Sequence, residues 1–151
     1  MGSEDFMKIR VILLLAAVLL CAAGCSGDPK HPDTRHNRNM FEQLTRTKLS
    51  PGVKEIYGFS HDFDIDPFYC LGFRATPEAV ARIVKKLDLQ KQPESSAETC
   101  IDRQLINVPW WDREERRRSE LYSMNDKKME MVFSLWYDPE TGKCQFLAFG
   151  Y

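Results

Sequence analysis

Residues 129–150 read MEMVFSLWYDPETGKCQFLAFG, and their pattern decides the fold class. From Met129 to Tyr137 every second residue is apolar, so these side chains share one face of a strand. The sequence DPETG at 138–142 supplies a proline for an early turn position and a glycine for a position with positive φ. The stretch therefore predicts a β-hairpin. Its second strand, residues 143–150, is apolar on both sides, and we expect it to be covered on both faces.

Three further strands precede this hairpin. Residues 53–60 alternate partly between apolar and polar side chains, and residues 68–74 are rich in aromatic and apolar ones. Residues 121–124 lead into a turn at Asn125-Asp126 and then into the hairpin. All three segments have the composition of strands bounded by turn residues.

The clearest helical signal lies over residues 77–88. Thr76 suits the N-cap and Pro77 suits the first helical position. The apolar side chains that follow share one helical face: Val80, Ile83, Val84 and Leu87. A weaker pattern after Asn39, stopped by Pro51-Gly52, predicts a second short helix over residues 40–49.

The order of these main elements is β-β-α-β-β-β. It predicts an α+β domain over residues 40–151, with an antiparallel sheet of about five strands and one main amphipathic helix packed on it. The segment that contains Trp110 and Trp111 is the candidate cover for the other face of the sheet.

The start of the chain has the features of an export signal. Lys8 and Arg10 precede an apolar run over residues 11–23, which is shorter than the roughly 20 residues of a membrane span. The run ends in Ala-Ala-Gly-Cys at Cys25, and this segment resembles the lipobox signal peptide of bacterial lipoproteins. The resemblance implies that residues 1–24 are removed and that Cys25 is lipidated with diacylglycerol and a fatty acyl chain such as palmitate.

The same resemblance implies a location in the bacterial cell envelope. Met7 is then the natural start of the chain, and several acyl chains give stable anchoring in the membrane. Ser26, rather than aspartate, follows the cysteine, which favours the outer membrane with the domain facing the periplasm. Residues 25–39 are expected to form a flexible tether, which would reach at most about 50 Å, because Ser26 to Asn39 contain no aliphatic side chain.

The net charge and the number of cysteines limit the partners and the disulfides that the sequence predicts. The formal net charge of −1 gives no reason to expect a nucleic acid partner. Three cysteines remain beyond Cys25, which allows one internal disulfide in an oxidising periplasm. We favour Cys100 with Cys144, because Cys70 lies in the middle of an apolar strand pattern; three unpaired thiols are the alternative.

One acidic segment has the composition of a cation site. Asp62, Asp64 and Asp66 follow His61, but Pro67 and Phe73 occupy the positions at which a calcium loop of the EF-hand type needs glycine and glutamate. A solvated acidic turn is favoured over a looser calcium or zinc site. His31 and His36 are assigned to a solvated linker, so no metal or other cofactor is expected.

Two adjacent tryptophans are the candidate binding residues. Neighbouring side chains in an extended segment point in opposite directions, so one of Trp110 and Trp111 can be core while the other stacks on a sugar ring. The arginines that follow alternate with acidic residues and predict a solvated, self-paired surface: Arg113, Arg116, Arg117 and Arg118.

The residues favour binding over catalysis. No serine elbow, zinc-protease motif or phosphate-binding loop occurs in the chain. We therefore expect a non-catalytic protein-binding lipoprotein with an immunity or envelope-assembly role. The alternatives are a cell-envelope hydrolase or redox enzyme that pairs His61 with a cysteine, and a glycan-binding module that uses Trp110 or Trp111.

Overall fold

A computed structural model describes residues 27–61, 67–93, 99, 102, 105 and 107–150. The N-terminal signal segment, Cys25, Asp62, Asp64, Asp66 and Cys100 lie outside the described residues. The helices and strands are α2 (Arg35–Thr45), β1 (Val53–His61), β2 (Phe68–Ala75), α3 (Pro77–Leu87), β3 (Gln90–Lys91), α4 (Arg113–Arg118), β4 (Glu120–Asp126), β5 (Met131–Tyr137) and β6 (Lys143–Gly150).

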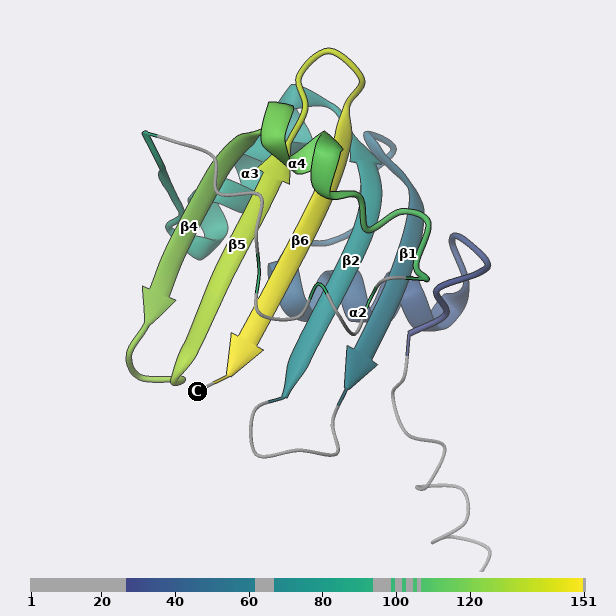
Figure 1. The fold of residues 1–151 in the computed structure, drawn as a ribbon, viewed down its shortest axis with the longest axis horizontal. Coiled ribbons are helices and arrows are strands. Elements are labelled where there is room, and N and C mark those ends of the chain that lie inside the picture. The colour runs from purple at the N-terminus through teal and green to yellow at the C-terminus, as the bar shows by residue number, and fades with distance from the viewer. Residues whose placement is uncertain are drawn as a thin grey trace, which may run out of the picture.

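The strands form one six-stranded sheet in the order β1-β2-β6-β5-β4-β3 (Figure 1). Every pairing is antiparallel, which confirms the predicted α+β class and the C-terminal hairpin. The predicted number of about five strands is one too low. The additional strand, β3, contains two residues, and so short a strand leaves no alternating pattern to detect.

The strand register defines the two ends of the sheet. One row of neighbouring residues crosses five strands at the lower end in Figure 1: His61, Phe68, Phe149, Val132 and Asn125. The turn between β4 and β5 lies at this same end. Gly58, three residues before His61, pairs with Leu71 and so lies about 10 Å above the lower row.

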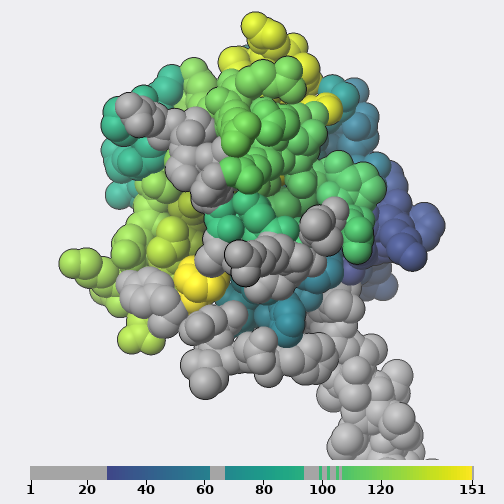
Figure 2. All heavy atoms as spheres, in the orientation of Figure 1, coloured from purple at the N-terminus to yellow at the C-terminus, as the bar shows by residue number. Residues whose placement is uncertain are grey.

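Both faces of the sheet are covered. Helices α2 and α3 pack on the rear face in Figure 1, where Phe41, Ile83 and Phe146 are almost completely buried. On the front face, Leu105 and Trp111 pack against Trp136 and Leu147. The green atoms of this segment and of α4 lie over the front of the sheet (Figure 2). The two-sided cover expected from the apolar last strand is thus confirmed.

Helix α3 begins as its sequence predicts. The Thr76 hydroxyl accepts a hydrogen bond from the Ala79 amide, and Pro77 is the first helical residue. Glu78 in the first turn and Lys85 and Lys86 in the last turn complement the helix dipole.

Helix α2 begins earlier than predicted. It starts at Arg35 with Thr34 as its N-cap, so the predicted start at Met40 is wrong. The first residues of the helix are polar and charged, and apolar periodicity becomes visible only from Met40. The cap, and not the burial of apolar side chains, therefore defines this end of the helix.

Residues before α2 are also held against the domain. The side chain of Asn37 is completely buried, accepts a hydrogen bond from the Asp28 amide and donates to the carbonyl oxygens of Asp28, His31 and Ile56. The Gly58 amide donates to the Asp28 carbonyl oxygen at 3.3 Å. Residues 28–39 are therefore not a flexible tether, because hydrogen bonds hold this polar segment where apolar burial does not.

This segment also protects the edge of the sheet. Asp33 accepts hydrogen bonds from the amides of Glu55 and Ile56, and its own amide donates to the Ile56 carbonyl oxygen. Unpaired edge groups are a template for aggregation, and here part of the β1 edge is satisfied within the chain. No helix in the described part of the chain is long and apolar enough to cross a membrane.

Candidate functional site

The two tryptophans separate as the sequence suggests, with one in the core. Trp111 is 7% exposed, and its ring meets the Trp136 ring edge to face at a centroid distance of 6.0 Å. Its indole nitrogen donates to Asp102 Oδ1 at 2.9 Å. Trp111 is therefore a structural residue of the front layer.

Arg116 belongs to the same buried cluster, which corrects its predicted place on a solvated surface. Its side chain is 0% exposed, and its guanidinium carbon lies 4.6 Å from the centre of the Trp111 ring and 5.4 Å from that of Trp136. It donates to Asp102 Oδ1 at 2.7 Å and to Gln145 Oε1 at 2.9 Å. The short helix α4 turns Arg116 inward, whereas Arg113, Arg117 and Arg118 are exposed.

The ionisation of this pair follows from its surroundings. Burial lowers the pKa of the Arg116 guanidinium, while the charge of Asp102 acts in the opposite direction. For Asp102, burial would raise the pKa, but hydrogen bonds from Thr99 and Trp111 and the charge of Arg116 more than offset it. The pKa of Asp102 is consequently below its ordinary value, and the pair is ionised at neutral pH.

Trp110 points away from this cluster and contributes to a pocket. Its ring lies on Gly72 of β2, where a Cβ atom would come within 2.5 Å of Trp110 Cε3. The ring is close to parallel with that of Tyr57 on β1, at an angle of 23° and a centroid distance of 6.1 Å. The indole nitrogen donates to the Pro29 carbonyl oxygen at 2.9 Å. Half-buried Trp110 therefore joins the N-terminal segment, β1 and β2.

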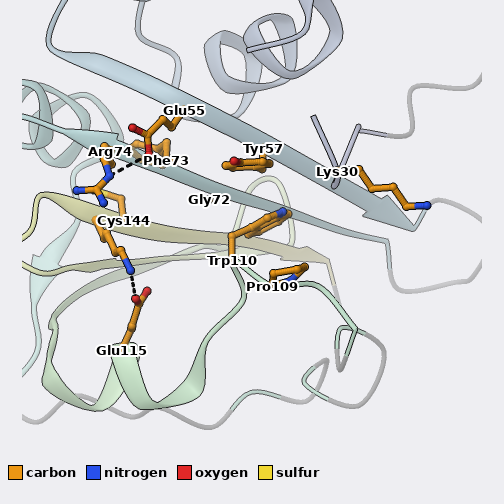
Figure 3. Close-up of a pocket in the computed structure, with 11 residues that line it drawn as sticks. Lys30, Glu55, Tyr57, Gly72, Phe73, Arg74, Pro109, Trp110, Glu115 and Cys144 are labelled. Atoms are coloured by element: carbon orange, nitrogen blue, oxygen red, sulfur yellow. Dashed lines mark hydrogen bonds and ion pairs between the residues drawn. The ribbon is translucent and has the colours of Figure 1, made fainter. Parts of the chain in front are cut away.

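The pocket beside these rings has a volume of about 320 Å³ (Figure 3). Two ion pairs lie on its rim: Arg74 Nε donates to Glu55 Oε2 at 2.9 Å, and Lys143 is paired with Glu115. Its described lining is Lys30, Glu55, Tyr57, Gly72, Phe73, Arg74, Pro109, Trp110, Glu115, Lys143 and Cys144. We call this site the Tyr57–Trp110 pocket. It combines an aromatic wall with preformed charges of both signs.

Cys144 contributes to the pocket lining, but its side chain belongs to the rear core cluster with Phe146 and Ala148, and its thiol is poorly suited to nucleophilic catalysis. Cys144 is buried and its Sγ donates weakly to the Gly142 carbonyl oxygen at 3.8 Å. Burial raises the pKa of the Cys144 thiol well above its ordinary value, so the thiolate is scarce. Cys144 is a free thiol in the structure. Its predicted partner, Cys100, lies outside the described residues, so the bridge stays a prediction. Cys70 is completely buried in the front layer.

The described histidines do not gather into a metal site. His61 packs beside the Phe68 ring, and His31 Nδ1 lies 3.0 Å from Asp28 Oδ2. His36 lies on α2, and its Nε2 atom is buried without a hydrogen-bond partner. Within the described ranges, no group of three or more histidine, cysteine or carboxylate side chains is arranged to hold a metal ion.

Comparisons of the chain with protein-family models, curated proteins and solved structures found no match. The chemistry of the site therefore depends on its own residues. Sequence reasoning identified Trp110 but missed Tyr57, Arg74 and Lys143. Register brings Tyr57 opposite Gly72, and that glycine is the one sequence signal in the strand pattern for a bulky group lying close above it.

Proposed function

We propose that the protein is a lipoprotein of the bacterial cell envelope, anchored through Cys25, that binds a protein partner without catalysing a reaction. The observation that carries this proposal is the Tyr57–Trp110 pocket, with its aromatic wall and its two ion pairs. Tryptophan, tyrosine and arginine supply most of the binding energy at typical protein interfaces. The outer membrane, with the domain facing the periplasm, is the proposed location.

The charges of the pocket suit a peptide segment of mixed polarity. Arg74 is fixed by Glu55 and also donates to the Thr141 carbonyl oxygen at 2.9 Å, so it is already oriented before a partner arrives. Preorganised groups lose less conformational entropy on binding. An aromatic or aliphatic side chain of the partner would lie against Tyr57 and Trp110, while its polar groups meet the paired charges.

Glycan binding is the second candidate, and one observation favours it. The nearly parallel rings of Tyr57 and Trp110 form a broad aromatic surface, on which the apolar face of a sugar can stack. Peptidoglycan is the glycan available in the proposed location. The burial of Trp111 restricts this proposal to Trp110.

Site-specific crosslinking in growing cells tests the protein-binding proposal. Tyr57→p-benzoylphenylalanine places a photoreactive aromatic group in the pocket, and the same replacement of Glu140, in the exposed β5–β6 turn, is the control. We expect a discrete protein adduct from position 57, absent from position 140 and lost when Arg74→Glu is added.

The affinity of pocket variants for the captured partner then measures how much the pocket contributes to binding. Trp110→Ala should weaken binding by about 2 kcal/mol or more, as expected for an interface hot spot, whereas Tyr122→Ala on the opposite face should leave binding unchanged. Equal adducts at positions 57 and 140 would contradict protein binding. Retention by purified peptidoglycan that is lost in Trp110→Ala would support the glycan alternative instead.

A further inference from the structure

A second cavity, of about 380 Å³, lies between α2 and the lower end of the sheet. Most of its walls are apolar and three of them are methionines, whose flexible side chains adapt to ligands of variable shape. Met129 is 50% exposed at its mouth. The described lining is His36, Asn39, Met40, Gln43, Leu44, Arg46, Tyr69, Met129, Met131 and Phe133. We call this cavity the α2 groove.

The α2 groove adjoins a basic cavity of about 430 Å³. Arg46 lines both cavities, and its guanidinium lies 5.9 Å from the centre of the Phe133 ring in the groove. The described residues around the second cavity are Arg46, Thr47, Arg82, Lys85 and Lys86, with no carboxylate among them. We call these four cationic side chains the basic cluster. Arg46 Nη2 also lies 3.8 Å from Asp126 Oδ2, so its charge is partly neutralised. The apolar groove thus ends at Arg46, beside the three other cations of the basic cluster.

One residue that lines the groove, His36, has a buried polar atom without a partner. His36 Nε2 is buried and has no hydrogen-bond partner in the described structure, which is unfavourable unless a ligand or water supplies one. His36 lines the same cavity as the methionines.

The N-terminus of the described chain lies close to Met40, one of the residues that line this groove. A Cβ atom on Gly58 would come within 2.9 Å of Met40 Sδ and within 3.3 Å of Gly27 Cα, so Gly27 is close to a residue that lines the groove. Only two residues, Ser26 and Gly27, separate Cys25 from Asp28, so the three Cα-to-Cα steps between them reach about 10 Å at most. If Cys25 carries the proposed lipid, the groove is therefore held close to the membrane surface.

We propose that the α2 groove and the basic cluster together bind an anionic phospholipid, with an acyl chain in the groove and the headgroup at Arg46, Arg82, Lys85 and Lys86. The location of this lipid in the anchoring membrane rests on the proposed function, but its chemistry rests on the groove. Acyl methylenes match the methionine-rich walls, and a phosphate matches the cluster. A symmetric pair of copies joined through this surface would bring like charges together, which disfavours a second copy as occupant.

Binding of monomeric lysophosphatidylglycerol tests the proposal. The protein is the mature chain from position 25 with Cys25→Ser, which carries no lipid of its own and keeps every described residue. We expect saturable binding with one site per chain, and weaker binding of lysophosphatidylcholine. The double change Lys85→Glu and Lys86→Glu should weaken binding at least about tenfold. The matched control, Arg117→Glu with Arg118→Glu on exposed positions of α4, should leave it unchanged.

Met129→Ser tests the apolar part separately, because this exposed side chain can change without disturbing the core and a neutral replacement adds no charge beside Arg46. This change should also weaken the binding of lysophosphatidylglycerol. Vesicles containing phosphatidylglycerol should retain the wild type but neither the Met129 variant nor the variant with Lys85→Glu and Lys86→Glu. The proposal is overturned if the wild type does not bind lysophosphatidylglycerol, or if the Met129 variant and the Lys85/Lys86 variant both bind it like the wild type. It is also overturned if the groove instead joins two copies of the chain into a dimer. Tyr57→Ala should bind the lipid normally. Failure of the lipid-binding proposal is therefore distinguishable from failure of the protein-binding proposal.

Discussion

At the scale of single residues, the ion pair between buried Arg116 and partly exposed Asp102 joins α4 to the segment that precedes it. The two side chains that accept hydrogen bonds from the Arg116 guanidinium lie far from it in sequence: Asp102 precedes it and Gln145 follows it. The local sequence of a run of alternating charges is the same whether all its side chains lie in solvent or one arginine is buried. The sequence pattern therefore predicted the exposure of Arg117 and missed the burial of Arg116.

Replacement of Asp102 should show how strongly the stability of the fold depends on the partner of buried Arg116. Asp102→Ala removes the carboxylate that lies 2.7 Å from the buried Arg116 guanidinium, and we expect a loss of about 3 kcal/mol in the free energy of unfolding. Denaturant unfolding measures the change. Glu114→Ala, which removes the exposed partner of Arg117, is the control and should cost about 0.5 kcal/mol or less. Equal losses in the two variants would contradict a structural role for the buried pair.

The same carboxylate should make stability depend on acid pH. Because the pKa of Asp102 is lowered in the folded state, its contribution is present above the unfolded-state pKa of about 3.9 and is lost as pH falls through the folded-state value. Asp102→Asn should therefore lose less stability than the wild type as the pH falls below about 4. Unfolding curves across this interval measure the slope. A wild-type slope that persists in Asp102→Asn would contradict this assignment.

At the scale of elements, the N-terminal segment acts as the cover of the β1 edge. Turn chemistry and helix caps are local signals, which is why the last hairpin and the start of α3 were predicted correctly. The start of α2 had a signal of the same kind in Thr34, but the absence of apolar residues before Met40 outweighed it. The hydrogen bonds of Asn37 to Asp28 and Ile56 are long-range and leave no local pattern.

Asn37 should control whether this segment stays attached. Asn37→Ala removes the hydrogen bonds of this side chain with Asp28, His31 and Ile56, which costs about 1 to 3 kcal/mol in total even though the Asp28 and Ile56 carbonyl oxygens keep backbone donors. We expect faster amide exchange at Gly58 and faster proteolysis within residues 28–33. Asn39→Ala, an exposed change two residues further along the same helix, should alter neither. Unchanged exchange at Gly58 in Asn37→Ala would show that other contacts hold the segment.

At the scale of the whole molecule, the sheet separates two candidate sites. The Tyr57–Trp110 pocket lies beside the front layer, and the α2 groove lies on the rear face toward the lower end. Covering both faces was predictable from the apolar last strand, but the composition of the pocket was not, because Tyr57, Arg74 and Lys143 come from three different strands. The attachment of residues 28–39 shortens the proposed tether from about 50 Å to about 10 Å. The domain would then work next to its membrane and not at a distance from it.

The proposed location, the proposed partner in the periplasm and the closeness of the groove to the membrane all follow from the proposed lipid at Cys25. The intact mass of the protein purified from cell membranes tests this directly. We predict a chain that begins at Cys25 and carries a thioether-linked diacylglycerol and an amide-linked acyl chain, while Cys25→Ser remains unlipidated. A wild-type chain in the membrane fraction that carries no lipid at Cys25 would contradict the account.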